Sequence, residues 1–115
     1  MDLVCDHRAS GGQAVCTVVG EIDLSTCDQL TNAALDAMQA HGCRLILDLS
    51  GVTFMDAQGI SCLVRLRREA AARGGQLTLA GVPHVVMRVL TITHMHQAFE
   101  TVVGAPSKGS LLGPR

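Results

Sequence analysis

The feature that most constrains the fold is the alternation of two apolar patterns in the second half of the chain. Residues 45–49 and 76–80 read as short strands, and between them apolar residues recur at helical spacing over residues 56–72. The nearly continuous apolar run at 45–49 is typical of a central strand buried on both faces of a sheet. Two strands joined by a helix predict a parallel pair with a helical crossover.

The N-terminal half predicts two further strands and another helix. We expect the strands at residues 3–5 and 14–19, with turn-forming residues at 9–13 between them. Apolar residues then follow at helical spacing over residues 30–38, and Gly42 supplies the stop. This helix has two candidate starts, and the choice stays open: each resembles the pair of side chains that caps a helix N-terminus, and the two pairs are Ser25 with Asp28 and Thr26 with Gln29.

The C-terminal part predicts a third helix and a last strand. Pro83 suits the first turn of a helix, and a weak strand pattern follows at residues 98–102. Residues 104–115 are rich in Gly, Pro and Ser, so we expect a flexible tail there. The predicted architecture is a single α/β domain over residues 1–103, with a mixed β-sheet, strand-helix alternation and helices packed on the sheet.

Composition narrows the function classes. The chain has 115 residues and a net charge of -1, with neither Trp nor Tyr and only Phe54 and Phe99 as aromatic side chains. Single-stranded nucleic acid binds to stacking aromatic residues, so nucleic acid is not an expected partner. The basic cluster of Arg65, Arg67 and Arg68 has helical spacing and is expected to be a solvated face. The sequence shows neither a signal peptide nor a membrane span, which predicts a cytoplasmic protein without membrane insertion.

The sequence contains five cysteines. An odd count favours reduced thiols over a secreted disulfide framework. We therefore expect five free thiols, at Cys5, Cys16, Cys27, Cys43 and Cys62.

The most informative stretch spans residues 48–60. It reads as a buried strand, a short turn and a new helix that begins at Asp56, whose carboxylate is placed to cap the helix. Ala57 and Gln58 should stand exposed in the first turn. Gly59 has no side chain, which should let another surface approach closely. By itself this pattern fits an ordinary capped helix as well as a binding surface.

Three segments in order resemble the STAS domain, and specifically bacterial anti-sigma factor antagonists. The first is Gly-Glu-Ile-Asp at residues 20–23, and the second is Phe-Met-Asp-Ala-Gln-Gly-Ile at residues 54–60. The third, at residues 73–82, is similar to the family's Gly-Gly-x-Leu-x-Leu-x-Gly stretch. The resemblance covers nearly the whole chain to about Val103, and it implies the STAS fold.

The resemblance also implies a partner and a surface. Family members bind an anti-sigma factor, often a serine kinase, and so free a sigma factor; the kinase can phosphorylate a serine of the antagonist and release it. That phosphoacceptor position holds Ala57 here, which excludes phosphorylation at the site without excluding binding. Thr53 and Ser61 are the nearest hydroxyls. A homodimer is left open, and the expected partner-binding residues are Asp23, Asp56, Ala57, Gln58, Gly59 and Ile60.

Several other residues have side chains that can bind metals or take part in catalysis, namely His94, His96, Cys62, Asp23 and Asp56. His94 and His96 lie in an expected loop without a Cys or carboxylate at ligand spacing, so exposed histidines are expected. Nothing orients Cys62 toward a base, and Asp23 and Asp56 are better explained as a surface carboxylate and a helix cap than as an acid/base pair. We therefore expect no enzymatic activity, no metal and no cofactor. The alternative function is a STAS subunit of a lipid-transport ABC complex that binds its ATPase.

Overall fold

The computed structural model describes residues 2–103, so the predicted tail at residues 104–115 lies outside the described residues. Strands and helices alternate after an initial pair of strands. Their order is β1 (Leu3–Ser10), β2 (Gln13–Ile22), α1 (Cys27–His41), β3 (Arg44–Met55), α2 (Ala57–Ala72), β4 (Gln76–Ala80), α3 (His84–Ile92) and β5 (Glu100–Val102).

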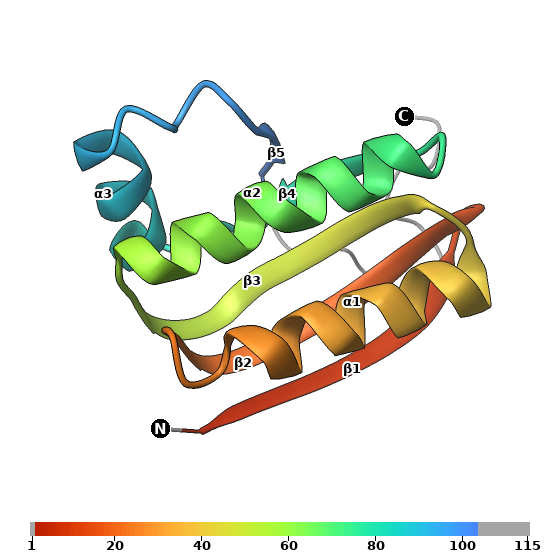
Figure 1. The fold of residues 1–115 in the computed structure, drawn as a ribbon, viewed down its shortest axis with the longest axis horizontal. Helices are drawn as coiled ribbons and strands as arrows, with labels where there is room; N and C mark the ends of the chain where they lie inside the picture. Colours follow the sequence, from red (N-terminus) through yellow and green to blue (C-terminus); the bar gives the residue numbers. More distant parts are fainter. Residues whose placement is uncertain (1, 104–115) are drawn as a thin grey trace.

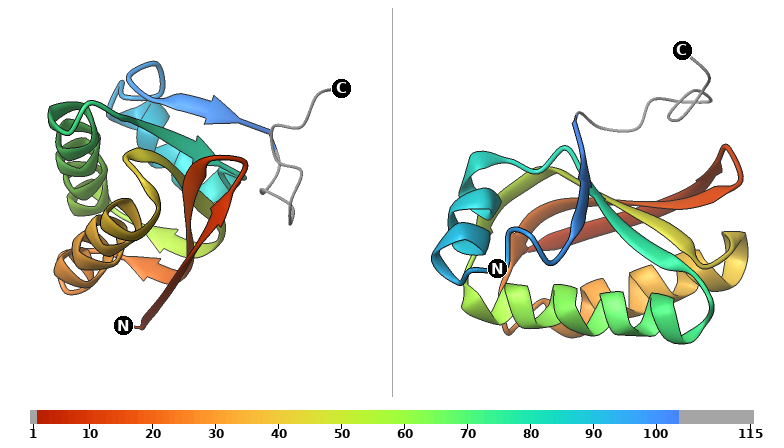
Figure 2. Two further views of the ribbon diagram at one scale, coloured as in Figure 1. Left: turned by 90° about the vertical axis from the view of Figure 1, so that its right-hand side faces the viewer. Right: turned by 90° about the horizontal axis from the view of Figure 1, so that it is seen from above.

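These strands form one mixed sheet in the order β1-β2-β3-β4-β5. β1 pairs with β2 in antiparallel orientation, whereas the β2–β3, β3–β4 and β4–β5 pairs are parallel. Figures 1 and 2 show α1 and α2 side by side on one face of the sheet, with α3 beside the end at which α2 begins. The predicted α/β architecture with a mixed sheet is confirmed.

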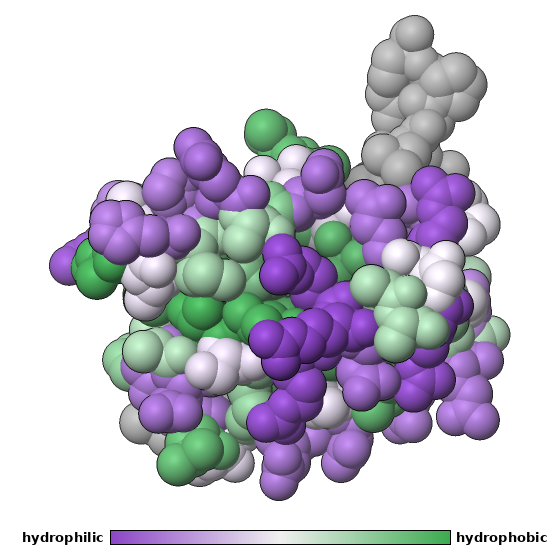
Figure 3. Space-filling view, turned by 45° about the horizontal axis from the view of Figure 1, so that its top comes forward, coloured by the Kyte–Doolittle hydropathy of each residue, from purple (hydrophilic) through white to green (hydrophobic). Residues whose placement is uncertain are grey.

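The main core lies between the sheet and the two long helices. Its largest members are almost fully inaccessible to solvent, and burial of each such aliphatic side chain contributes about 1.5–3 kcal/mol. On the outside, hydrophilic side chains dominate the face in Figure 3, with hydrophobic residues gathered between them. Core side chains from the helices and the central strand include Leu30, Met38, Leu47, Leu63 and Leu66.

The first two strands are longer than predicted. β1 continues through Asp6, His7 and Arg8, which the apolar pattern excluded, because β1 lies at the edge of the sheet and exposes much of its length. The turn between the strands contracts to Gly11 and Gly12, whose φ values of 58° and 80° lie in the left-handed region that favours glycine.

The turn predicted after residue 49 is wrong, because β3 continues to Met55. The pairing with β2 shifts register between Thr17 and Val19 and again between Gly20 and Glu21. Such irregularities let the ladder resume after a locally displaced residue. The long strand therefore delivers the chain directly to the start of α2. Among residues 2–103, no helix is long and apolar enough to cross a bilayer.

Candidate functional site

The start of α2 has the predicted cap. Asp56 is the N-cap residue, with extended backbone angles of φ -119° and ψ -173°. Its Oδ1 accepts a hydrogen bond from the backbone N–H of Gly59 at 3.1 Å. This bond satisfies a donor that the helix itself leaves unpaired, and it holds a carboxylate at the positive end of the helix.

The first turn of α2 has an exposed side and a buried side. Ala57 and Gln58 are exposed, as predicted, whereas Gly59 and Ile60 are buried. The expected close approach at Gly59 is made by the chain itself, because Gly59 packs against the ends of β2 and β3. Contact of Gly59 with a partner stays a prediction. A Cβ at this position would lie 2.7 Å from Met55 Cγ and 3.0 Å from the carbonyl oxygen of Ile22, so the close neighbour is the chain's own β2 end.

The loop after β2 is organised by Asp23. Its Oδ1 accepts hydrogen bonds from the Ser25 hydroxyl at 2.6 Å, the Ser25 N–H at 2.9 Å and the Thr26 N–H at 3.2 Å. These bonds, above all that from the Ser25 hydroxyl, lower the pKa of Asp23 because they favour the charged carboxylate. Asp23 is largely buried, so it acts first as the centre of this loop.

The two predicted capping pairs of α1 are not formed as expected. Thr26 occupies the N-cap position, but its side chain makes no capping hydrogen bond. Its hydroxyl points back to the loop, where it accepts from the Asp23 N–H at 3.0 Å and donates to the carbonyl of Glu21 at 2.8 Å. The preceding Asp23 already occupies the Thr26 N–H, which explains why the local sequence pattern was misleading.

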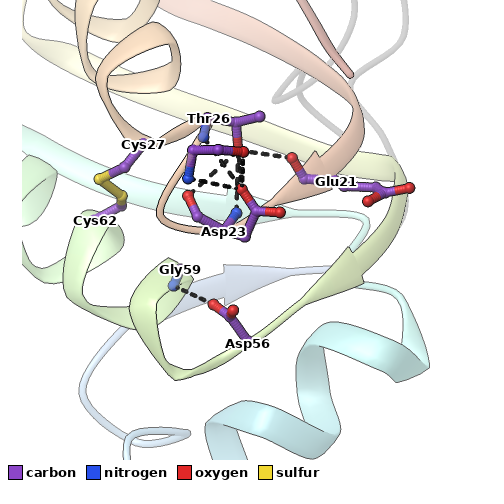
Figure 4. Close-up of a disulfide and its surroundings, with 8 residues drawn as sticks. Glu21, Asp23, Thr26, Cys27, Asp56, Gly59 and Cys62 are labelled. Atoms are coloured by element: carbon purple, nitrogen blue, oxygen red, sulfur yellow. Dashed lines mark hydrogen bonds between the residues drawn. A yellow bond between two sulfur atoms is a disulfide. The ribbon is translucent and has the colours of Figure 1, made fainter. Parts of the chain in front are cut away.

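A disulfide joins the two segments of the site. Cys27, the first residue of α1, is bonded to Cys62 in α2, and both are buried (Figure 4). The expectation of five reduced thiols is therefore wrong, and three free cysteines remain among the described residues. Because the partners are 35 residues apart in sequence, spacing alone did not reveal the pair. In this state Cys62 has no thiol to act as a nucleophile.

The residues of both segments that reach solvent define what we call the candidate surface, in which Asp56 is half-buried and the others are exposed: Leu24, Ser25, Asp56, Ala57 and Gln58. Leu24 has 73% of its surface exposed and was missed by the sequence prediction. Its exposed side chain adds apolar area beside the hydrogen-bonded Asp23 loop. The signal was its position directly after Asp23, within a motif that was already singled out.

Two hydroxyl groups lie near Ala57 in the sequence, at Thr53 and Ser61. Thr53 is exposed on β3, and its hydroxyl donates to the carbonyl of Gly20 at 3.3 Å. Ser61 is exposed one turn further along α2 than Ala57. Neither takes the place of Ala57 at the helix start.

The histidines after α3 are exposed, as expected. His94 has a φ of 60° and follows the end of the helix, and His96 lies in the same loop. Within residues 2–103 no group of three or more His, Cys, Asp or Glu side chains is arranged to hold a metal ion. The two carboxylates of the site are each engaged in organising backbone, with Asp23 bonded to its loop and Asp56 to Gly59.

Comparisons with known proteins agree on one family. A family model described as "Mlab, STAS domain" matches residues 5–104. An anti-sigma factor antagonist from Mycobacterium paratuberculosis has 22% identity and a TM-score of 0.75, over 87% of this chain and 85% of that chain. An anti-sigma-factor antagonist (STAS) domain protein from Planctomyces limnophilus has 20% identity and a TM-score of 0.71, over 88% and 90%. Unphosphorylated SpoIIAA has 18% identity and a TM-score of 0.69, over 86% and 88%.

The structural likenesses establish the shared fold at low sequence identity. The family match covers most of the chain and includes the Asp23 loop and the start of α2. The chain belongs to the STAS domain family.

Proposed function

We propose that this protein is an anti-sigma factor antagonist, which binds an anti-sigma factor of the serine-kinase type and so frees a sigma factor. The observation that carries the proposal is the candidate surface, where the two motif segments lie together. The support from known proteins is that structures with this fold are named as anti-sigma factor antagonists.

The candidate surface is suited to a protein contact. Gly59 packs on Ile22, and the disulfide joins the first residue of α1 to α2, so the two segments are held in one arrangement. A preorganised surface loses less conformational entropy on binding. Ala57 and Leu24 supply exposed apolar side chains, while the neighbouring Asp23 and Ile60 are buried.

The same surface lacks the usual release switch. Ala57 has no hydroxyl, so a kinase partner cannot place a phosphate at the start of α2. Binding is then governed by the concentration of the antagonist and is insensitive to ATP. The protein acts by contact and performs no catalysis of its own, and it needs neither a metal nor a cofactor.

The test is calorimetric titration of the protein against each anti-sigma kinase of its source organism. Wild type should bind one of them, and Ala57→Glu should weaken that binding by about 2–5 kcal/mol, because a charge enters a desolvated contact. The favourable interaction of the new carboxylate with the N-terminus of α2 is smaller, about 0.3–1 kcal/mol. The net effect on partner binding should therefore be a loss of affinity.

Asn32→Glu is the matched control, since it adds the same charge at an exposed position of α1, and it should bind like wild type. The proposal fails when no anti-sigma kinase binds, or when Ala57→Glu binds as tightly as the control.

One observation favours a second candidate function. The matching family model is described by the name Mlab and not as an anti-sigma factor antagonist. In this alternative the protein is a STAS subunit of a lipid-transport ABC complex and binds its ATPase through the same surface. Titration against the transporter ATPases of the source organism separates the two functions, because binding there and to no anti-sigma kinase supports only the second.

A further inference from the structure

A groove continues the candidate surface along α2. It has a volume of about 470 Å³ and is open to solvent. One wall is the exposed side of α2, and the other is the loop that follows α3. The residues that line it are Ile60, Ser61, Val64, Arg65, Arg68 and Met95.

The loop wall is held in place by backbone and side-chain bonds. The Met95 N–H donates to the carbonyl of Leu90 at 2.7 Å, and the His94 N–H donates to the carbonyl of Thr91 at 3.1 Å. From the α2 side, Arg67 Nη1 donates to the carbonyl of Ala98 at 2.6 Å. The guanidinium of Arg67 also lies 5.4 Å from the ring centre of Phe99. The groove is therefore a built feature, and Arg67 is structural.

The groove combines an apolar floor with two cationic side chains. Ile60, Val64 and Met95 contribute the apolar surface, and Figure 3 shows hydrophobic residues bordered by strongly hydrophilic ones on this side of the molecule. Arg65 and Arg68 are exposed. Within residues 2–103, neither Arg65 nor Arg68 forms an ion pair, and the nearby carboxylate of Glu69 pairs with Arg73 instead.

We propose that this groove binds an acidic amphipathic segment of the partner protein. Two carboxylates of that segment pair with Arg65 and Arg68, and an apolar side chain between them rests on Val64 and Met95. A guanidinium presents a planar fork of donors that matches a carboxylate, which makes arginine well suited to such pairing. Burial next to the apolar floor strengthens these pairs relative to open water.

This inference rests on the proposed function, because the groove shares Ile60 with the segment that carries the candidate surface. It adds the chemistry of the partner. Two arginines on a chain of net charge -1 are a small footprint for nucleic acid or for an anionic membrane, which are bound through several phosphates at once. A single protein segment needs only two contacts of this kind.

The first experiment compares two double variants of equal charge in calorimetric titrations with the anti-sigma kinase that wild type binds. Arg65→Glu/Arg68→Glu should weaken binding at least tenfold and reduce its dependence on salt, because two interfacial ion pairs are lost. Arg44→Glu/Arg73→Glu changes the net charge equally at exposed positions outside the groove, away from the start of α2, and it should bind within twofold of wild type. Equal binding by both variants overturns the inference while leaving the proposed function intact.

The second experiment needs no identified partner. The ¹⁵N-labelled protein is titrated with a synthetic peptide of alternating Leu and Glu residues, and with the same peptide carrying Gln in place of Glu. The acidic peptide should shift the amide signals of Ile60, Val64 and Met95, and the Gln peptide should not. A shift by the acidic peptide supports the groove chemistry even when no anti-sigma kinase binds. The experiment therefore distinguishes failure of the groove inference from failure of the proposed function.

Two further probes are included in the same titration, namely phosphatidylglycerol vesicles and a thymidine oligonucleotide. Neither should shift the groove signals. Absence of any shift with the acidic peptide, or saturation by vesicles or oligonucleotide instead, overturns the inference.

Discussion

Ala57 is an exposed residue in the first turn of α2, and its methyl group stands where the family resemblance places a phosphorylated serine. Asp56 caps the helix, and the backbone at the start of α2 remains a favourable position for negative charge. The resemblance places a second serine or threonine where Gln58 stands, but the phosphoacceptor position itself is Ala57. One substitution therefore tests whether restoring that hydroxyl restores the switch.

We predict that Ala57→Ser makes the protein a substrate of its kinase partner. With ATP the variant should gain one phosphoryl group and dissociate, because the phosphate adds about -1.5 to -2 charges within the contact. Wild type should remain bound under the same conditions. Mass spectrometry and titration with and without ATP measure both effects, and Ser61→Ala in the Ala57→Ser background is the control. Phosphorylation of wild type on Thr53 or Ser61, followed by release, would show that another hydroxyl serves as the switch.

Because Gly59 has no side chain, the start of α2 can pack closely against Ile22 at the end of β2. We predict that Gly59→Ala destabilises the protein by about 1–3 kcal/mol, since the new methyl group overlaps Met55 and approaches Ile22. The better helix propensity of alanine returns at most about 1 kcal/mol. Urea denaturation measures the change, with Gln58→Ala at the neighbouring exposed position as the control. If the two variants have equal urea midpoints, α2 can move away from β2 with little loss of free energy of unfolding, and the prediction is wrong.

Asp23 links loop geometry to pH. Its pKa lies below the ordinary value near 3.8, so the charged form is favoured in the folded protein. The contribution of Asp23 to stability is therefore complete above pH of about 3.8 and is lost as pH falls through the lower folded pKa. We predict that Asp23→Asn is less stable than wild type at neutral pH and that the difference shrinks in acid. Thermal unfolding from neutral pH to below 3 measures it, with Asp28→Asn as the control; a difference that persists unchanged in acid would contradict the assignment.

At the scale of elements, the disulfide covalently links α1 to α2. It joins the first residue of α1 to the second turn of α2, and it closes a loop of 35 residues that contains α1 and β3. In the chain-entropy description, the link restricts the unfolded chain and so stabilises the folded one.

We predict that reduction by a dithiol lowers the free energy of unfolding by about 4 kcal/mol, the chain-entropy value for a loop of this length. Thiol titration of the unfolded protein should find three free thiols before reduction and five after it, because three cysteines of the described chain are unpaired. Urea denaturation of the oxidised and reduced forms gives the energy. Cys43→Ser should respond to the dithiol like wild type, whereas Cys27→Ser/Cys62→Ser should not respond at all.

At the scale of the whole molecule, the proposed surface lies at one end of the sheet (Figure 1). α2 starts at that end, α3 lies beside it, and the Asp23 loop closes it on the other side (Figure 2). The candidate surface and the groove are continuous along α2. The proposed partner therefore meets a preorganised face built from segments that are distant in sequence.

Local sequence patterns by themselves determined several features of this protein. The strand at residues 76–80, the cap at Asp56 and the exposed Ala57 and Gln58 were all predicted, because apolar periodicity and capping depend on residues within one or two turns of each other. The mixed sheet followed from the alternation of these elements.

Only the tertiary structure decided the rest, because it depends on pairings across the chain. β1 extends through polar residues since an edge strand is not required to be apolar, and β3 extends since β2 offers it a partner through Met55. The bond between Cys27 and Cys62 and the wall that Met95 adds to the groove have no local signal. The β2–β3 pairing at Met55 and the disulfide bring together residues more than 30 positions apart, where neither periodicity nor spacing in the sequence carries information. The β1 extension pairs with nearby β2, but its polar residues gave no strand signal.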